Sequence, residues 1–479
     1  MYTYKKTVSL CIGLAIFFLS MGMVAQPAIG DHTGAEVTFA DDIAPILYEN
    51  CVKCHRPGGV GPMSLVTYEE VQPWAPLIMH KTQLRDRMGA MPPYYLERGI
   101  GIQQVKDDER LSEEQIEMIA SWAEHNAPMG LRENIPPPPE FDDSNAWKLG
   151  TPDLVVALDD VTVKAGASDS WIAGDLVPIG LTEDRYVSAV EMREVNNADP
   201  AAAGATVVGG LYIFHHMSWA TVEAEEDIAN RDLEQLNWPV HELGRNPDIF
   251  DPKAGRILKA GSSVMPTTYH LHSNGQDTTG HMELGFYFHP KGYEPEHKRG
   301  RMSLGDGMNI SVQGNMKDQE LHTYTVLQEH TKISSFEPHL HGPGARMCLE
   351  AIWGNQIETL ACSGYDHNWV KQYTFEDDYA PLLPKGTIVH MIGYMDNTTA
   401  NSNVADARNW SGSGNASITN MFLHLGQSVT LTDQQFVQEM AERRERLGLT
   451  ANDHIIGCPL CLADLLPLPD MSDSADRGE

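Results

Sequence analysis

The stretch LYIFHHMSW, residues 211–219, combines aromatic and β-branched residues with two adjacent histidines. This composition predicts a buried β-strand, because such side chains fill the faces of a pleated sheet. Successive side chains of a regular strand point to opposite faces, so His215 and His216 would not reach the same partner. If both histidines bind one metal ion, the strand must twist, bulge or end at this pair.

The chain beyond residue 148 repeats this β-strand texture. Short β-branched or aromatic runs alternate with Gly, Pro, Asn and Asp, as in RYVSAVEMREV (185–195) and HMELGFYFHP (281–290). Strands at such spacing predict antiparallel β-sandwiches of the jelly-roll kind. We expect two of them, at 149–312 and 313–450, because a sandwich needs a hundred residues or more.

Two segments carry helix signals instead. In LSEEQIEMIASWAEH (111–125), Ser112 and Gln115 form a capping pair ahead of apolar residues at helical spacing. In the late segment LTDQQFVQEMAERRERLGL, Thr432 and Gln435 form a second pair, and Gly448 marks the expected helix end. The first helix closes a small all-α domain and the second follows the β region.

A proline run separates the helical domain from the β region. Four consecutive prolines stand in NIPPPPEFDDSN (134–145) and predict a stiff extended spacer. We therefore expect a helical domain at 31–133 and a linker at 134–148. The chain is multidomain, with one small helical domain ahead of two β-sandwiches.

The N-terminal segment has the features of a secretory signal. Two lysines precede an apolar run from Val8 to about Val24, and small residues follow near Ala28. This order predicts a signal peptide over 1–30 and a periplasmic or secreted protein. The alternative is an uncleaved membrane anchor, because the apolar run approaches the length of a membrane span. No later segment is long and apolar enough to span, so the mature chain should lack one.

The charge balance argues against polyanionic partners. The chain of 479 residues carries 34 Lys and Arg against 66 Asp and Glu, a formal net charge of -32. Such an acidic surface repels nucleic acid and anionic lipid while favouring solubility. We expect no nucleic-acid partner.

The motif ENCVKCHRPGG (49–59) indicates one covalently attached c-type haem. Cys51 and Cys54 flank two residues and His55 follows directly, which is the spacing for thioether attachment with an axial histidine. For the sixth iron ligand we expect Met91, because the two prolines after it fix an extended loop. Met88 and Met63 are the alternatives.

Paired histidines in the β region indicate a metal site. Besides the adjacent pair at 215–216, histidines alternate with one other residue in TYHLHSNGQ (268–276) and FEPHLHGPGARM (336–347). Side chains at i and i+2 of a strand project from one face, which suits a late transition metal. No HExxH or facial-triad pattern argues for zinc or non-haem iron, and no cysteine stands where blue copper requires it. Histidine-ligated copper remains.

At this point three motifs carry a family resemblance. FHHM (214–217), HLHGPG (339–344) and SITNMFLHLG (417–426) resemble the copper-ligand motifs of the type II copper, ascorbate-dependent monooxygenases, the family of peptidylglycine α-hydroxylating and dopamine β-monooxygenase. The resemblance covers roughly residues 150–430. The segment FADDIAPILYENCVKCHRPGGVGPMSL (39–65) resembles the cytochrome that precedes the catalytic domains in haem-bearing bacterial members.

The resemblance implies two copper ions with separate ligand sets. For the first, electron-supplying copper it implies His215, His216 and His270, with His272 as the alternative third ligand. For the second, oxygen-activating copper it implies the catalytic set His339, His341 and Met421, with Met347 competing for the place of Met421. A thioether ligand helps to hold the reduced ion.

The activity implied is hydroxylation of a C–H bond with O2. The substrate would be a small molecule or peptide-like, and electrons would reach copper through the haem from a periplasmic donor or an ascorbate-like reductant. Substrate-recognition residues of the peptide and catecholamine enzymes do not transfer to this chain. The alternative is an electron-transfer or copper-binding protein without oxygenase turnover.

Four further cysteines are candidates for disulfides. Cys348 and Cys362 could bridge in an oxidising compartment. Cys458 and Cys461 lie in GCPLC (457–461), within an acidic tail at 451–479, where a disulfide competes with metal delivery or redox exchange.

Overall fold

The computed structural model describes most of the chain beyond residue 35. The described residues are 36–57, 59–140, 147–199, 210–223, 238–245, 247–299, 304–305, 309–414, 416, 418–450 and 453–461. The expected signal peptide, part of the linker and most of the tail lie outside them. The chain divides into two units, Met1–Glu36 and Val37–Glu479. No helix in the described ranges has both the length and the apolar character to cross a bilayer.

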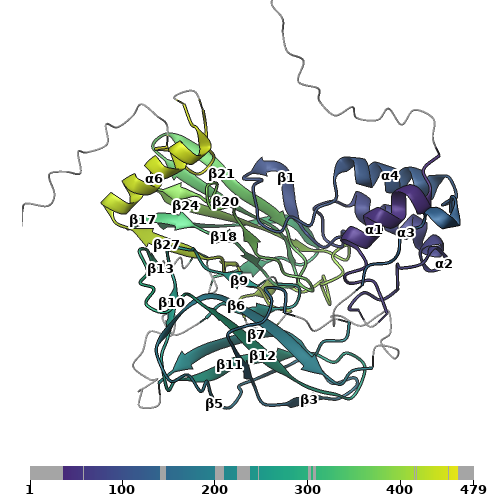
Figure 1. Cartoon of the computed structure of the whole chain (residues 1–479), viewed down its shortest axis with the longest axis horizontal. Coiled ribbons are helices and arrows are strands. Elements are labelled where there is room, and N and C mark those ends of the chain that lie inside the picture. Colours follow the sequence, from purple (N-terminus) through teal and green to yellow (C-terminus); the bar gives the residue numbers. More distant parts are fainter. Residues whose placement is uncertain are drawn as a thin grey trace, which may run out of the picture. The chain divides into compact units, whose positions relative to one another are not determined.

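A helical region begins the second unit (Figure 1). Its helices are η1 (Phe39–Ile43), α1 (Ala44–Asn50), α2 (Tyr68–Val71), η2 (Gln72–Trp74), α3 (Ala75–Gln83), α4 (Glu113–Glu124) and η3 (Arg132–Asn134). They enclose a core of their own around Phe39, Leu47, Ile119 and Trp122. The expected capping box of α4 is present, since the Ser112 side chain accepts from the Gln115 amide.

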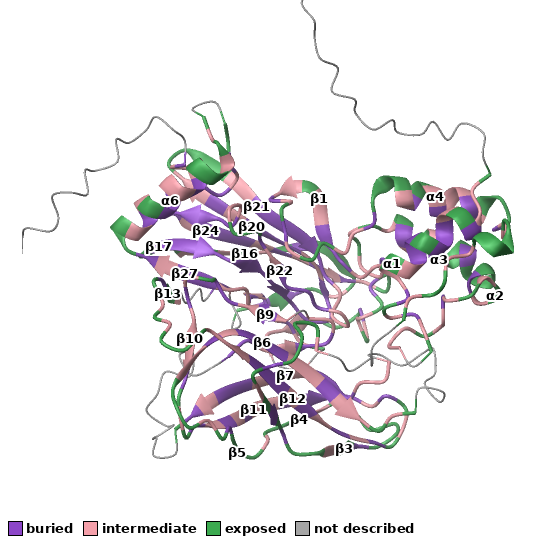
Figure 2. Ribbon diagram, viewed as in Figure 1, coloured by how far each residue is buried: buried purple, intermediate pink, exposed green. Residues whose placement is uncertain are grey.

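Two antiparallel sheets enclose the core of the first β region. One sheet has strands β2 (Leu154–Ala157), β3 (Val161–Val163), β6 (Arg185–Asn196), β9 (Asp248–Ile249), β10 (Arg256–Leu258) and β12 (Thr278–Phe288). The other has β4 (Ser170–Ile172), β5 (Val177–Pro178), β7 (Phe214–Val222), β8 (His241–Glu242) and β11 (Ser263–Leu271). Buried residues run along β7, β11 and β12 (Figure 2), and Trp219 and Phe286 meet edge to face in the core between the sheets.

The second β region is built around a five-stranded antiparallel sheet. Its order is β1 (Leu96–Gly101), β21 (Gln356–Gly364), β20 (Gly344–Trp353), β24 (Ile388–Asn397) and β16 (Met316–Val326). A four-stranded sheet adds β13 (Lys298–Arg299), β27 (Ser428–Leu431), β17 (His330–Ile333) and β23 (Leu382–Leu383). Smaller sheets pair β14 (Leu304–Gly305) and β19 (Pro338–His339) with β26 (Leu423–His424), β15 (Ser311–Val312) with β25 (Ser411–Gly412), and β18 (Ser335–Phe336) with β22 (Tyr373–Thr374).

Antiparallel sheets around separate cores confirm the expected β-rich architecture at the level of sheets. Helix α6 (Asp433–Leu447) also confirms its expected limits, with the Thr432–Gln435 capping box at one end and Gly448 in the left-handed conformation at the other. Strand β1 was not foreseen. It lies within the range expected for the helical domain, yet it pairs with β21, and Leu96 is buried in the core of the second β region.

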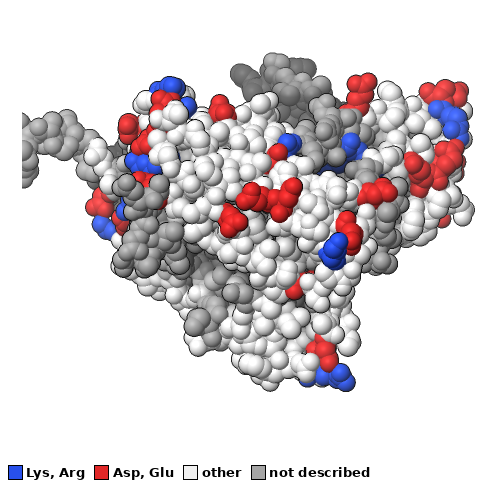
Figure 3. All heavy atoms as spheres, turned by 90° about the horizontal axis from the view of Figure 1, so that it is seen from below, with Lys and Arg blue, Asp and Glu red and all other residues white. Residues whose placement is uncertain are grey.

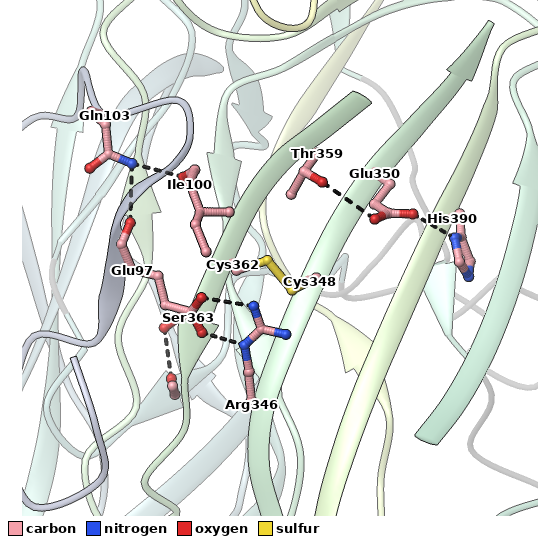
Figure 4. Close-up of a disulfide and its surroundings, with 11 residues drawn as sticks. Glu97, Ile100, Gln103, Arg346, Cys348, Glu350, Thr359, Cys362, Ser363 and His390 are labelled. Carbon is pink, nitrogen blue, oxygen red and sulfur yellow. Dashed lines mark hydrogen bonds and ion pairs between the residues drawn. A yellow bond between two sulfur atoms is a disulfide. The ribbon is translucent and has the colours of Figure 1, made fainter. Parts of the chain in front are cut away.

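Two disulfides are present. Cys348 bridges to its cross-strand partner Cys362 in the five-stranded sheet, and both are buried beside the pairs Arg346–Glu97 and Glu350–His390 (Figure 4). Cys458 bridges to Cys461. Both pairs are the ones the sequence suggested.

Candidate metal centre

The expected distortion at the adjacent histidines is present as a β-bulge. Strand β7 pairs with β11 so that His216 faces His270 and Phe214 faces Leu271, which leaves His215 as an extra residue. A bulge re-aims the side chain of the extra residue. His215 and His216 therefore sit beside different neighbours.

Three other rings surround His215. Ring centroids lie 4.8 Å from His270, 5.6 Å from His272 and 4.8 Å from His367. We call His215, His270, His272 and His367 the first cluster. His270 and His272 come from β11 and the residue that follows it, whereas His367 comes from the loop after β21 of the other β region. His367 was not among the expected ligands, because it stands alone in YDHNW (365–369) and not in a histidine pair.

Ring nitrogens of the first cluster lack protein partners. His215 Nε2, His272 Nδ1 and His367 Nε2 are buried and have no hydrogen-bond partner among the described residues. The other nitrogen of His272 donates to the Tyr212 carbonyl at 3.0 Å, and His270 Nε2 lies 3.1 Å from Asp169 Oδ2. A carbonyl or carboxylate behind a histidine fixes its tautomer and leaves the opposite nitrogen free for a metal ion.

His339 and His341 form the second cluster with Glu242. Their rings are 5.4 Å apart, and His341 Nδ1 is buried and has no hydrogen-bond partner among the described residues. Glu242 Oε1 lies 2.5 Å from His339 Nδ1 and 3.3 Å from His216 Nδ1. The other nitrogen of His216 lies 3.1 Å from the Ser218 hydroxyl, so both of its nitrogens have partners.

Met421 lies two residues before the strand that pairs with the His339 segment. β19 and β26 are antiparallel, with Pro338 opposite His424 and His339 opposite Leu423. His341 and Met421 lie just outside this short ladder, so the pairing does not test whether Met421 belongs to the cluster. Met347 instead lies fully buried in the apolar core, on β20.

The two clusters are in contact. The rings of His367 and His341 lie 5.5 Å apart. The protein therefore holds one continuous series of imidazole rings, contributed by both β regions.

Burial controls the charge of these rings. Burial, reinforced by neighbouring histidines, lowers the pKa of His341 to about 2 and that of His367 to about 3, and it lowers the pKa of His215 well below the usual value. These imidazoles are neutral at physiological pH, as metal ligands must be. Burial alone would raise the pKa of Glu242, but His339 and His216 hold it well below its usual range, so the carboxylate is charged.

Donor type and free nitrogens suit a late transition metal. The ligands are not drawn together around a single point, since no three His, Cys, Asp or Glu side chains among the described residues form a closed metal-binding group. The fit rests on the chemistry of the donors: buried imidazoles, four of them with an unpartnered ring nitrogen, and an orienting carboxylate.

The CxxCH motif has two free thiols and a histidine with one ring nitrogen held by a carbonyl. Cys51 and Cys54 are free thiols and not a disulfide. His55 Nδ1 lies 3.2 Å from the Met63 carbonyl, which leaves Nε2 available to iron. A Cβ at Gly61 would lie 2.5 Å from the His55 ring, so only glycine allows this approach. These residues fit a covalent haem with His55 as ligand.

The methionine candidates for the sixth iron ligand occupy different surroundings. Met91 is 39% exposed. Met88 is partly buried, and its sulfur accepts from Asn403 Nδ2 at 3.4 Å. Met63 packs against the helical core.

Comparison with known proteins adds no assignment. No protein-family model matches the sequence, and no characterised protein matches it. Among solved structures, the cowpea mosaic virus top component matches at a TM-score of 0.22 and 9% identity over 61% of this chain and 95% of that chain. The infectious bursal disease virus VP2 subviral particle matches at a TM-score of 0.11 and 8% identity over 62% and 90%. Likenesses this weak carry no argument about fold or function.

Proposed function

We propose that this protein is an exported, copper-dependent monooxygenase that hydroxylates a C–H bond of a small-molecule or peptide-like substrate with O2. Electrons reach two copper ions through one covalent c-type haem. The observation that carries the proposal is the series of neighbouring buried imidazoles, contributed by both β regions, in which His215, His272, His341 and His367 each keep a ring nitrogen without a partner among the described residues. On the face in Figure 3, basic side chains are scattered among acidic ones and form no continuous basic patch. A polyanion would need such a patch, so this face fits a partner that is not a polyanion.

The first copper would be held by His215, His272 and His367. All three have a buried ring nitrogen without a hydrogen-bond partner among the described residues. His270 is the alternative ligand: its Nε2 lies beside Asp169, and its ring stacks on Trp171 at 4.4 Å and packs against His215. This set keeps one of the two adjacent histidines and adds a ligand from the second β region.

The second copper would be held by His339, His341 and Met421. His216 then acts behind the site: with Glu242 it fixes the ring of His339 from the side away from the ion. A buried anion between two ligand-bearing segments also offsets the charge that a cation brings into the protein interior.

The reaction requires two electrons and two protons for each O2, giving one hydroxylated product and one water. Bound copper and haem supply the one-electron redox chemistry, and a periplasmic donor or an ascorbate-like reductant supplies the electrons. Burial keeps His215, His341 and His367 neutral and excludes water, and Glu242 and the Tyr212 carbonyl orient His339 and His272. Arg245 holds Glu337 and Asp248 behind the second cluster through buried ion pairs, which keeps this wall of the site rigid.

The first experiment is metal and haem analysis joined to O2 uptake. We expect about two copper ions and one haem for each chain, with O2 uptake that depends on a substrate fraction and a reductant. His339→Ala should abolish that uptake and leave the haem spectrum intact.

A matched control is His281→Ala. His281 lies on β12, outside both clusters, and pairs with Asp160. This variant should bind as much copper as the wild type and take up O2 at the same rate. Unchanged O2 uptake in His339→Ala would refute the assignment of the site. A protein that binds copper and haem fully but takes up no O2 with any substrate would instead be an electron-transfer protein.

A further inference from the structure

A separate pair of histidines lies on the five-stranded sheet, on the face turned away from its apolar core. Strand register sets Tyr324 of β16 opposite His390 of β24, and His322 stands two residues before Tyr324 on the same face. Diagonal neighbours of this kind lie within reach of long side chains. Met391, which follows His390, is fully buried in the apolar core, so its neighbour His390 points to the opposite face.

The two rings point a nitrogen at each other. His322 Nδ1 lies 3.1 Å from His390 Nε2, and the ring planes are inclined by 17°. Two nitrogens that bind one ion at the Zn–N length of about 2.0–2.1 Å are about 2.9 Å apart at a right angle and about 3.3 Å apart at the tetrahedral angle. The observed separation lies between these values, so it has the width that one transition-metal ion requires.

A carboxylate lies behind the far nitrogen of each ring. Glu350 Oε2 lies 2.9 Å from His390 Nδ1, and Thr359 donates to the other oxygen of Glu350 at 3.4 Å (Figure 4). Glu320 Oε2 lies 3.3 Å from His322 Nε2. A carboxylate behind an imidazole accepts the ring N–H and leaves the opposite nitrogen with its lone pair.

Two lone pairs therefore face each other across the 3.1 Å gap. A neutral imidazole carries a single N–H, and in both rings that N–H points at a carboxylate. Facing lone pairs repel unless a cation or a proton lies between them. No Lys or Arg pairs with Glu320 or Glu350 among the described residues, so the local charge is negative as well. Both features favour a bound cation.

The pair is held in place and is still open to solvent. The His322 side chain is 39% exposed and the His390 side chain is 10% exposed. Tyr324 stacks on the His390 ring at a centroid distance of 4.3 Å. Ligands that are already fixed lose little conformational freedom when an ion binds, so this arrangement favours binding.

From this geometry we propose that His322 and His390 form a binding site for a divalent late transition-metal ion, with Glu320 and Glu350 orienting the two rings. Imidazole nitrogen suits Zn²⁺ and Cu²⁺, whereas Mg²⁺ requires oxygen ligands. Because no third His, Cys, Asp or Glu joins the pair among the described residues, water completes the coordination. The site goes beyond the proposed function, since it needs neither haem nor the two clusters and involves no electron transfer.

Zinc is the probe for this site, because Zn²⁺ binds imidazole and has no redox chemistry. The full chain, with its copper and haem counted, is dialysed against Zn²⁺, and bound zinc is counted in the wild type and in His322→Ala. We expect one zinc ion fewer in the variant, and no difference between the two proteins with Mg²⁺. Equal zinc counts would overturn the proposal and would mean that the two rings share a proton.

Glu350→Gln tests the orienting role and leaves both rings in place. The amide loses the charge that holds His390, so the affinity for this zinc ion should fall about 10- to 100-fold. Circular dichroism should match the wild type, which separates the effect from misfolding. An unchanged affinity would overturn the role assigned to Glu350.

The matched control is His281→Ala. His281 is a single imidazole between two carboxylates, with Asp160 at 2.7 Å and Glu283 at 3.8 Å. This variant should bind as much zinc as the wild type, because it leaves the facing rings intact. A loss equal to that in His322→Ala would mean that zinc binds histidine–carboxylate pairs in general, and it would overturn the assignment to His322 and His390.

Discussion

Some residues of the two clusters would bind metal, and others hold those metal-binding residues in place. His216 and Glu242 belong to the second kind, because both His216 nitrogens have partners and Glu242 lies between two imidazoles. The carboxylate is nearly inaccessible to solvent, so its charge acts on its neighbours with little screening.

Replacement of Glu242 by Gln should therefore weaken copper binding. The amide keeps the shape of the side chain but loses the charge that orients His339, and loss of such a partner typically lowers metal affinity about 10- to 100-fold. Competition with a chromophoric chelator measures the affinity of each site. The affinity for one of the two copper ions should fall, and the affinity for the other should stay unchanged.

The control for this prediction is Glu283→Gln. Glu283 lies on β12, and its carboxylate pairs with Arg193. Its copper affinity should match the wild type. Equal weakening in both variants would point to a general loss of negative charge and would contradict the orienting role of Glu242.

The sequence could anticipate part of this detail. The bulge at His215 was predictable, because strand alternation conflicts with an adjacent histidine pair. His367 and Glu242 were not, since each stands alone in its segment and reaches the clusters only through contacts between distant strands. Tyr212 could not be found from its side chain, because its backbone carbonyl makes the contact.

At the scale of elements, local signals were reliable where the element depends on local contacts. The capping boxes of α4 and α6 and the left-handed Gly448 are written in short motifs, and the structure has all three. Strand β1 depends on pairing with β21 more than 250 positions along the chain (Leu96 opposite Ser363), so no local pattern marks it.

The cap of α6 gives a prediction at this scale. Thr432→Ala removes the side chain that accepts from the Gln435 amide and should lower the free energy of unfolding by about 1 kcal/mol. Urea unfolding followed by circular dichroism measures it. Gln438→Ala, at an exposed position inside the same helix, should change stability little; a comparable loss there would show that the cap has no special weight.

At the scale of the whole molecule, ion pairs join regions that are distant in sequence. Glu109 is the clearest case. Burial would raise its pKa, but Lys371 and Lys53 lower it to about 2. Because the pKa is lower in the folded state than in the unfolded chain, the carboxylate stabilises the fold above about pH 4.3 and loses this effect as pH falls toward about 2.

Glu109→Gln should therefore destabilise the protein by about 2 kcal/mol at pH 7, and the difference from wild type should shrink as pH falls from about 4 to about 2. Unfolding midpoints at a series of pH values measure this difference. Glu113→Gln, at the exposed Arg85 pair, should show little effect at any pH. A Glu109→Gln penalty that stayed constant with pH would mean that packing, and not charge, is what the variant loses.

The disulfides give a second prediction at this scale. Cys348 and Cys362 are separated by 14 positions, so replacing both with Ala should cost about 3 kcal/mol in the chain-entropy view. Cys458 and Cys461 are separated by 3, and the same replacement there should cost less because the closed loop is shorter. Urea midpoints of the two double variants rank them, and the opposite order would contradict the loop-length argument.

Sheet content, helix limits and disulfide pairing were thus accessible from sequence, because each leaves a local or pairwise pattern. The grouping of His215 with His270, and of His339 with His341, was expected from the family resemblance, and the ring contacts agree with it. The contacts of His216 with Glu242 and of His367 with His215 were not expected, because they depend on how distant strands meet.

The hydrogen bond between the Tyr212 carbonyl and His272 has a consequence for genetics. Every amino acid supplies the same carbonyl, so no codon change at position 212 deletes this contact. An alanine scan reports only the effect of removing the Tyr212 side chain, so it would not detect the hydrogen bond that the backbone carbonyl accepts. Only an amide-to-ester exchange in the backbone, or a change that moves the whole segment, would expose it.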